Sequence, residues 1–245
     1  MSRCEGTPFR KADLHLHTPE SVCFRDKSVT PEQIVETALA RGLDIIAVTD
    51  HNTVEAIDDI VQAAKNKSLS VFPGIEVSTR EGHVLAIFDL DTPRSTLEDL
   101  LDHIGIDGKK RGDATVVADR GMEEVCKNIE EYNGIAIAAH IERWPSGFLE
   151  TNEPRRVKMR IHGNQFLSVL ELTISENRSQ WSAGRVRGYP KKYACIQGSD
   201  AHGLEEIGRR PVYIQMEKVS LAALRSAFLD HETRVVFPNE HSPGS

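Results

Sequence analysis

Short apolar runs alternate with helix-length segments along nearly the whole of this 245-residue chain, and this alternation restricts the fold more than any other feature. Residues 9–14 and 43–48 have the composition of strands. Between them, Thr30 and Gln33 form a capping box that predicts a helix ending at Gly42. A strand, a helix and a second strand are typical of a βαβ unit with two parallel strands.

The same alternation continues almost to the C-terminal end of the chain. Asn52 or Thr53 can cap a helix that runs to Lys65. Further helices are predicted at 96–104, 122–132 and 221–229. Further strands are predicted at 69–72, 84–88, 135–139, 167–172, 193–197 and 212–215. An α/β fold follows, either a TIM-like barrel or an open doubly wound sheet.

The barrel is favoured because two fingerprints of open sheets are missing. No G-x-G-x-x-G follows the first strand, and no G-x-x-x-x-G-K-[ST] occurs anywhere in the chain. We therefore expect one TIM-like barrel domain over residues 1–237. Residues 238–245, with two prolines and a glycine, are expected to form a flexible tail.

Composition excludes several classes of protein. The longest apolar runs, such as 43–48 and 135–139, are far shorter than the roughly 20 residues that a transmembrane helix needs. The N-terminus lacks the apolar core of a secretory signal, so we expect a cytoplasmic protein with no membrane partner. Four cysteines without any C-x-x-C spacing argue against a zinc finger or a disulfide scaffold: Cys4, Cys23, Cys126 and Cys195.

Charge is distributed unevenly along the chain. The net charge is −7, yet residues 141–195 contain ten Lys and Arg against five Glu and no Asp. This basic segment can border a cleft for an anionic substrate, or it can be a solvated loop. Trp144, Trp181 and Tyr189 lie in it, where aromatic rings can stack a nucleobase or simply pack a loop.

Histidines and acids gather at the predicted strand ends. They end or follow five strands and open a sixth: His15, His17, Asp50, His51, Glu76, His83, His140, Asp200 and His202. Since the carboxyl ends of parallel barrel strands meet at one face, these side chains are expected to converge. Strand alternation turns both imidazoles of His15-Leu16-His17 to one side. Imidazoles mixed with carboxylates indicate a multinuclear site for zinc, manganese, iron or nickel, whereas any one histidine alone is more often a core or surface residue.

Five motifs, in their order along the chain, resemble those of the polymerase-and-histidinol-phosphatase (PHP) family of metal-dependent phosphoesterases. They are DLHLHT at 13–18, TDHN at 49–52, PGIEV at 73–77, AH at 139–140 and GSDAH at 198–202. The resemblance extends over about residues 11–210 and implies a distorted (β/α)7 barrel that holds up to three metal ions. Carried across by position, it implies these metal ligands: His15, His17, Asp26, His51, Glu76, His83, His140, Asp200 and His202.

Asp26 departs from the family pattern. Relatives commonly have a short Ser-Asp-Gly turn before a Thr-Pro-Glu helix start, whereas Asp26 lies in a longer loop that contains Cys23. Its approach to the metals is therefore expected to differ. For Cys23 we expect a partly buried thiol without a role.

The resemblance implies hydrolysis of a phosphomonoester or phosphodiester by a metal-activated water at a di- or trinuclear site of Mn, Zn or Fe. No G-x-S-x-G nucleophile motif competes with this mechanism. Asp50 is expected to orient an imidazole, and Arg143 and Arg209 to donate hydrogen bonds to the phosphate, although an arginine taken singly is more often a structural or surface residue. The expected substrate is a phosphorylated small molecule, a nucleotide or a short nucleic acid, and phosphate or sulfate is expected to bind at the site.

Two other functions remain open at this stage. An amidohydrolase-like C–N hydrolase also begins with H-x-H after its first strand, but the TDHN and GSDAH motifs resemble the PHP pattern more closely. A non-catalytic metal-binding PHP module of a larger ATPase-type protein is the other, and the complete ligand set argues against it. The sequence does not determine the metal, the exact substrate or the oligomeric state.

Overall fold

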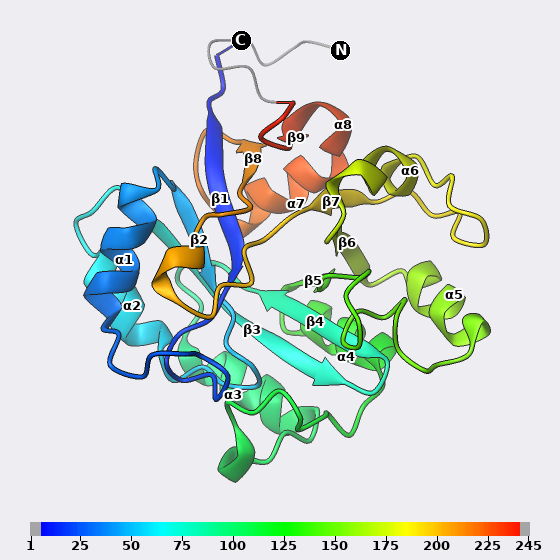
Figure 1. Ribbon diagram of the computed structural model, residues 1–245, viewed down its shortest axis with the longest axis horizontal. Helices are drawn as coiled ribbons and strands as arrows, with labels where there is room; N and C mark the ends of the chain where they lie inside the picture. The colour runs from blue at the N-terminus through cyan, green and yellow to red at the C-terminus, as the bar shows by residue number, and fades with distance from the viewer. Residues whose placement is uncertain (1–5, 241–245) are drawn as a thin grey trace.

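The computed structural model describes residues 6–240 and contains nine strands joined in one curved sheet (Figure 1). The strands are β1 (Phe9–Leu16), β2 (Ile45–Val48), β3 (Ser70–Thr79), β4 (Gly82–Ile87), β5 (Ile135–Ala138), β6 (Leu167–Glu171), β7 (Ala194–Ile196), β8 (Val212–Gln215) and β9 (Val235–Val236). Their order in the sheet is β7-β6-β5-β4-β3-β2-β1-β8-β9. Neighbours in the sheet are therefore mostly neighbours in the sequence, as connections between successive elements favour.

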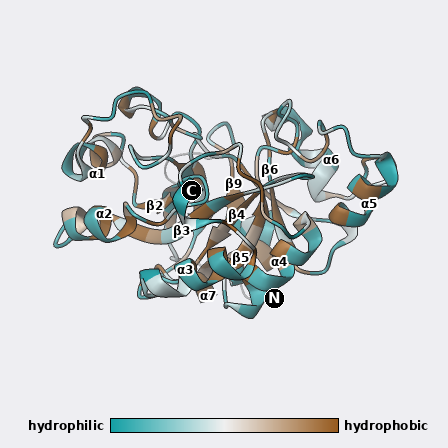
Figure 2. Cartoon of the chain, turned by 90° about the horizontal axis from the view of Figure 1, so that it is seen from below, coloured by the Kyte–Doolittle hydropathy of each residue, from teal (hydrophilic) through white to brown (hydrophobic). Residues whose placement is uncertain are grey.

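Helices surround this sheet. They are α1 (Pro31–Ala40), α2 (Ile57–Ala64), α3 (Arg94–His103), α4 (Met122–Glu131), α5 (Arg155–Gly163), α6 (Arg178–Ser182), α7 (Leu221–Leu229) and α8 (His231–Arg234). Three short 3-10 turns lie at Gly108–Lys110, Ser175–Asn177 and Leu204–Glu206. Hydrophobic residues concentrate on the strands and hydrophilic residues on the outer helix faces (Figure 2). Burial of the apolar strand faces under amphipathic helices drives this arrangement.

The two ends of the curved sheet approach each other closely. Beyond β7, the amide of Asp200 donates to the carbonyl of His15 at 2.8 Å, and the amide of His17 donates to the carbonyl of Ala201 at 3.0 Å. These bonds join the segment after β7 to the end of β1. The result is a nearly closed barrel, and the predicted barrel class is confirmed.

Not every strand runs parallel, which differs from the expectation of a parallel barrel. Strand β4 is antiparallel to both β3 and β5, and β8 is antiparallel to β1. A strand that runs in reverse has its beginning where its neighbours have their ends. His83, the second residue of β4, therefore still lies at the end of the barrel where β5 leads into His140.

The capping signals gave one correct and one wrong helix start. At α1, Thr30 accepts a hydrogen bond from the amide of Gln33, and the Gln33 side chain accepts one from Thr30, as the capping box predicts. The start predicted at Asn52 or Thr53 was wrong, because α2 begins at Ile57. The Asn52 side chain instead accepts a hydrogen bond from the amide of Ser78 in β3 and donates to the carbonyls of Asp113 and Val116, so it does not cap a helix.

The expected tail lies only partly within the described chain. Its residues 241–245, like Cys4 near the other end, lie outside the described residues. Glu240 accepts a hydrogen bond from the amide of Phe237 at 2.9 Å and pairs with Arg178, so the beginning of this segment is held by contacts. We retain the division into a barrel domain, 1–237, and a tail, 238–245, as a proposal.

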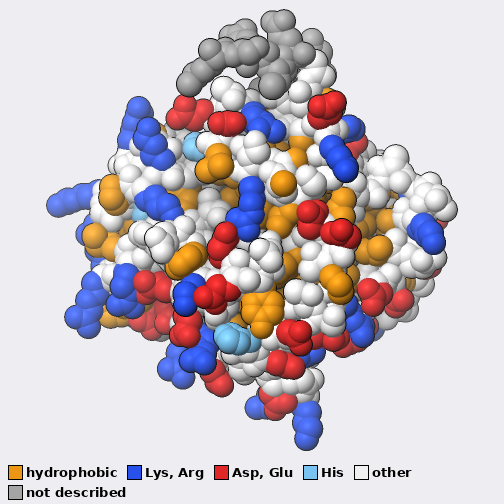
Figure 3. All heavy atoms as spheres, turned by 180° about the vertical axis from the view of Figure 1, so that it is seen from behind, with side chains coloured by type: hydrophobic (Ala, Val, Ile, Leu, Met, Phe, Trp, Pro, Cys, Tyr) orange, Lys and Arg blue, Asp and Glu red, His pale blue; other side chains and the backbone are white. Residues whose placement is uncertain are grey.

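Two surface properties bear on function. No helix of the described chain is both long and apolar enough to cross a membrane. On the face opposite to that of Figure 1, basic and acidic side chains are interspersed, as Figure 3 shows. That face therefore offers no extended cationic surface to a polyanion.

Candidate metal centre

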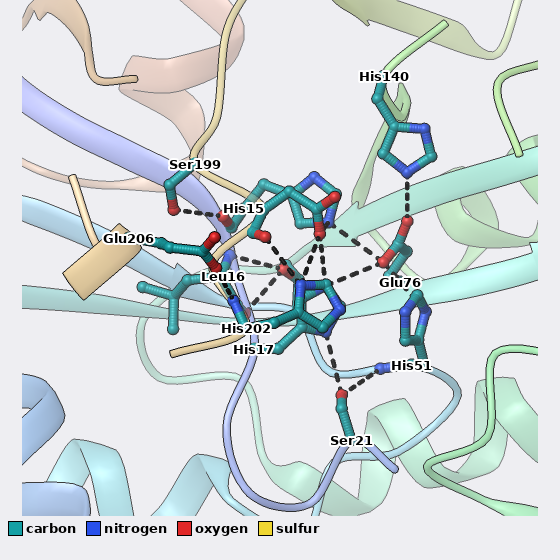
Figure 4. Close-up of polar contacts among 12 residues, drawn as sticks. His15, Leu16, His17, Ser21, His51, Glu76, His140, Ser199, His202 and Glu206 are labelled. Atoms are coloured by element: carbon teal, nitrogen blue, oxygen red, sulfur yellow. Dashed lines mark hydrogen bonds and ion pairs between the residues drawn. The ribbon is translucent and has the colours of Figure 1, made fainter. Parts of the chain in front are cut away.

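Glu76 is the hub of a buried cluster of histidines at one end of the barrel (Figure 4). Its Oε1 lies 2.8 Å from Nδ1 of His83 and 2.9 Å from Nε2 of His140. Its Oε2 lies 3.1 Å from Nε2 of His15, 3.2 Å from Nε2 of His17 and 3.1 Å from Nδ1 of His51. Five imidazoles from four strands or strand ends thus share one carboxylate.

Glu76 was expected just after a strand but lies inside β3, which extends to Thr79. The continuation exists because β4 folds back as an antiparallel partner and pairs Glu76 with Leu85. The side chain is nevertheless fully buried and faces the cluster.

Asp200 is the second shared carboxylate. Its Oδ1 lies 2.9 Å from Nε2 of His17 and 3.3 Å from Nε2 of His15, and its Oδ2 pairs with Arg143. His202 packs on His17 with ring centroids 4.3 Å apart. The tertiary fold therefore joins residues that are about 180 positions apart in sequence into one polar pocket.

The histidines of the cluster differ in pKa because their immediate surroundings differ. Burial lowers the pKa of His51 to about 2 and that of His202 to about 3. Burial alone would also lower the pKa of His15, but the carboxylates of Glu171 and Glu76 raise it to about 10. Burial would raise the pKa of Glu76, yet the nearby imidazoles hold it well below its usual range. The neutral rings of His51 and His202 and the ionised carboxylate of Glu76 are thus in the forms that ligate a metal, whereas the protonated ring of His15 has to lose a proton to do so.

These side chains fit metal ions. Three overlapping groups have ligand atoms within 4.8 Å of one another: His17, His51 and His202; His15, His17, Glu76 and Asp200; His51, Glu76 and His83. A zinc–nitrogen bond is about 2.0–2.1 Å long, so two ligands of one tetrahedral ion lie roughly 3.3 Å apart, close to the 3.1 Å between Nδ1 of His51 and Oε2 of Glu76. That nitrogen is buried and has no hydrogen-bond partner among the described residues. A lone pair left without a donor is the form in which imidazole binds a metal.

Glu171 orients two members of the cluster and was not singled out from the sequence. Its Oε2 accepts hydrogen bonds from Nδ1 of His15 at 2.8 Å and from the amide of His140 at 3.0 Å. Such a carboxylate fixes the tautomer and direction of a ligating ring. The available signal was an acid at the end of the apolar strand 167–171, the same signal that identified the other site residues.

Asp50 acts on His17 through a serine. The Oγ of Ser21 lies 3.0 Å from Nδ1 of His17 and donates to Oδ1 of Asp50 at 2.6 Å, whereas His17 and Asp50 themselves are 4.0 Å apart. The expected orienting role of Asp50 is therefore relayed by a residue that no sequence pattern marked. Thr18 donates two further hydrogen bonds to Asp50 and holds it in place.

Two site residues have unfavourable backbone conformations. His140 has φ of +27° and Asp200 has φ of +48°, in the left-handed region that side chains with a Cβ rarely occupy. Such conformations cost of order 1–3 kcal/mol and persist where surrounding contacts impose them. His140 lies shortly after β5 and Asp200 shortly after β7, and both carry side chains into the cluster, so the backbone strain occurs at the site.

The remaining predicted site residues lie away from the ligand groups. Asp26 is exposed, and its carboxylate accepts hydrogen bonds from the amide and Oγ of Ser28, which lower its pKa. Arg209 donates to the carbonyl of Ser199 and to Glu206. Of the two arginines predicted to bind phosphate, Arg143 alone contacts a carboxylate of the cluster. The structure thus brings together all the predicted ligands except Asp26.

The aromatic residues of the basic segment separate into two groups. Trp181 and Tyr189 are buried and contact each other with ring centroids 5.6 Å apart. Trp144 is 76% exposed. Cys23 is exposed, although partial burial of its thiol raises its pKa to about 11. A thiol with so high a pKa is a poor nucleophile at neutral pH.

Comparison with known proteins agrees with this geometry. The PHP domain family matches residues 13–198 of the chain. An uncharacterised protein of Methanocaldococcus jannaschii is 28% identical over 138 residues, which are 53% of this chain and 67% of that protein. A 5′-3′ exoribonuclease of Haemophilus influenzae is 35% identical over 92 residues, 36% of this chain and 32% of the relative. This chain therefore spans about a third of that exoribonuclease.

Among solved structures, the lesion-specific endonuclease Q of Pyrococcus furiosus is similar in fold. Its TM-score is 0.72 at 17% sequence identity, and the match covers 93% of this chain and 57% of that one. At this identity the likeness concerns the fold alone. The polar end of the barrel described above therefore has to be interpreted from its own residues.

Proposed function

The chain belongs to the PHP domain family, as the resemblance of its motifs predicted, and we propose that it is a metal-dependent phosphoesterase acting on nucleotides or nucleic acid. The observation that carries the proposal is the convergence of six imidazoles on the buried carboxylates of Glu76 and Asp200. A set of ligands this dense, in a sequence without a G-x-S-x-G nucleophile motif, favours hydrolysis at bound ions.

The three overlapping ligand groups are the proposed places for two or three divalent ions. When bound, such ions lower the pKa of a coordinated water and place positive charge beside the phosphoryl oxygens. Mn, Zn and Fe all suit a mixture of imidazole and carboxylate ligands. Glu76, which contributes to two of the groups, is the proposed bridging ligand.

In this proposal, other residues of the chain orient the ligand rings and bind the phosphate. Glu171 and the Ser21–Asp50 pair hold the rings of His15 and His17 in fixed directions, which keeps the ligand positions preorganised. Arg143 lies at the mouth of the cluster with its guanidinium against Asp200. A planar guanidinium can donate two parallel hydrogen bonds to a phosphate, so Arg143 is the proposed phosphate-binding side chain.

The substrate class follows from charge and from the relatives. An ion-loaded pocket reverses the local charge of an acidic protein and attracts anions. The exoribonuclease and the endonuclease similar to this chain act on nucleic acid by their names. A nucleotide or the end of a short nucleic acid is therefore the proposed substrate, with other phosphorylated metabolites as the alternative to test.

The test is a substrate panel on protein reconstituted with Mn, Zn or Fe. It compares a nucleoside bisphosphate, short RNA, short DNA, histidinol phosphate and an aryl phosphate. The wild-type protein should hydrolyse at least one of them, and the double variant His15→Ala, His17→Ala should hydrolyse none. Equal activity of the double variant and the wild type would refute the proposal.

A further inference from the structure

Trp144 is held close to the metal centre by two short links. The preceding residue, Arg143, pairs with Asp200. Two residues after Trp144, the carbonyl of Ser146 accepts a hydrogen bond from the amide of His83 at 3.1 Å. The turn between these links is closed by a bond of 2.7 Å from the amide of Gly147 to the carbonyl of Arg143. Both ends of the turn are thus fixed to residues of the cluster.

The indole itself is left open to solvent. Trp144 is 76% exposed, whereas Trp181, the other tryptophan, is 4% exposed. Trp181 contacts the rings of Tyr189 and His162, but within residues 6–240 no aromatic ring contacts Trp144. A tryptophan offers a large flat apolar face together with an N–H donor, and this combination makes it frequent where proteins contact other molecules.

We propose that Trp144 is a stacking platform for the base of the nucleotide whose phosphate binds at the metal centre. The proposal rests on the proposed function and deepens it, since it names the part of the substrate that lies outside the cluster. Arg143 and Trp144 are adjacent in one turn, so the segment that carries the proposed phosphate donor also carries the exposed indole that would stack on the base of the same ligand. Stacking tolerates every base, so the preference is for the presence of a base and not for its identity.

Kinetics on paired substrates test this assignment. The first pair is adenosine 5′-monophosphate and ribose 5-phosphate, and the second is a short oligonucleotide and one of equal length with an abasic terminal residue. Stacking is worth about 1–3 kcal/mol per base, so Trp144→Ala should lower kcat/KM for the base-containing substrate roughly 5- to 150-fold, mainly through KM. It should leave the abasic substrate nearly unchanged, and Trp144→Phe should retain most of the preference.

Leu229→Ala is the matched control. Leu229 is 84% exposed at the end of α7 and lines a cavity of about 750 Å³ beside the first residues of β5, β6 and β7, which is the opposite end of these strands from the metal centre. Leu229→Ala should leave kcat/KM unchanged for both substrates of each pair. An equal loss on both substrates in Trp144→Ala, or no loss on either, would overturn the stacking assignment.

Fluorescence provides a test that does not depend on turnover. Adenosine 5′-monophosphate should quench the emission of the wild-type protein and of Trp181→Phe, while ribose 5-phosphate should not. Trp144→Phe should lose this quenching. If quenching persists in Trp144→Phe, the assignment of Trp144 as the stacking platform is wrong, even if the kinetic results agree with it. If quenching follows Trp144 but no substrate is hydrolysed, the platform stands and the proposed function fails.

Discussion

His15 and His162 are both fully buried, yet they lie in opposite surroundings. His15 lies between the carboxylates of Glu171 and Glu76, which raise its pKa to about 10. His162, on α5, is enclosed by aromatic rings, with centroids 5.0 Å away at Tyr193 and 5.1 Å away at Tyr189. Neither of its ring nitrogens has a hydrogen-bond partner among the described residues, and burial lowers its pKa to about 4.

Burial alone therefore does not mark a functional histidine. What distinguishes the metal centre is that ionised carboxylates replace the water that each imidazole loses. The aromatic pocket instead keeps the His162 ring neutral, and the ring packs there like an apolar side chain. If this distinction is right, changes to the carboxylates should disturb metal binding and activity, and changes to His162 should disturb only stability.

The largest effect is expected for Glu76→Gln. The amide keeps the shape of the side chain but removes the negative charge that five imidazoles share. Because loss of an orienting residue already costs 10- to 100-fold, loss of this central ligand should lower activity by more than about 100-fold. Steady-state kinetics and metal content after dialysis measure both effects. Full activity with normal metal content in Glu76→Gln would contradict the assignment of Glu76 as a ligand.

Metal removal should destabilise the wild-type protein. Ions present at about 100 times their dissociation constant stabilise the folded state by about 2.7 kcal/mol, which corresponds to roughly 5–11 °C in the melting temperature of a chain of this size. Calorimetry with and without a chelator measures the difference. Glu76→Gln should show a much smaller shift, whereas His162→Phe should show the same shift as the wild type. A chelator without effect on the wild-type melting temperature would speak against bound ions.

A smaller effect is expected for Glu171→Ala, which makes the surroundings of His15 more like those of His162. Loss of the bond at 2.8 Å frees the His15 ring to turn, and metal affinity should fall about 10- to 100-fold. Glu171→Gln can still accept the hydrogen bond and should recover part of that affinity. Competition with a metal indicator dye measures the metal affinity of both variants and of the wild type. Unchanged affinity in both variants would leave Glu171 as a purely structural residue.

The smallest effect concerns pH and His162. Its pKa is lower in the folded state than the ordinary value of 6.5, so the unfolded chain takes up the proton first as pH falls. The stability contributed by the neutral ring is complete above pH 6.5 and is lost as pH falls towards about 4. At pH 5 this loss amounts to about 1–2 kcal/mol. Urea unfolding at pH 7 and pH 5 measures the difference in unfolding free energy between the wild type and His162→Phe. The change in this difference between the two pH values gives the contribution of His162.

His162→Phe should therefore gain relative stability at the lower pH. Its activity at neutral pH should equal that of the wild type, because no cluster residue contacts His162 in the described chain. A difference in stability that is the same at both pH values would show that His162 is not held neutral by its pocket.

The sequence alone determined the barrel class to a large extent and predicted most of the residues that the fold brings together in the cluster. His15 lies on a strand, where backbone periodicity sets the direction of its side chain, and His17, His51 and Asp200 follow strands, so all four could be assigned to one end of the barrel without any knowledge of packing. The cap at Thr30 is equally local, since its partner Gln33 lies three residues away. Five motifs in one order then gave the family.

Only the tertiary structure decided the rest. The bond between Glu171 and His15 joins residues 156 positions apart, and no local pattern encodes it. In loops, backbone periodicity no longer fixes the direction of a side chain, so Asp26 turned to Ser28 and Trp144 stayed exposed while Trp181 packed inside. Strand ends follow a repeating rule of the chain, whereas loops and long-range partners are determined by how the whole molecule packs.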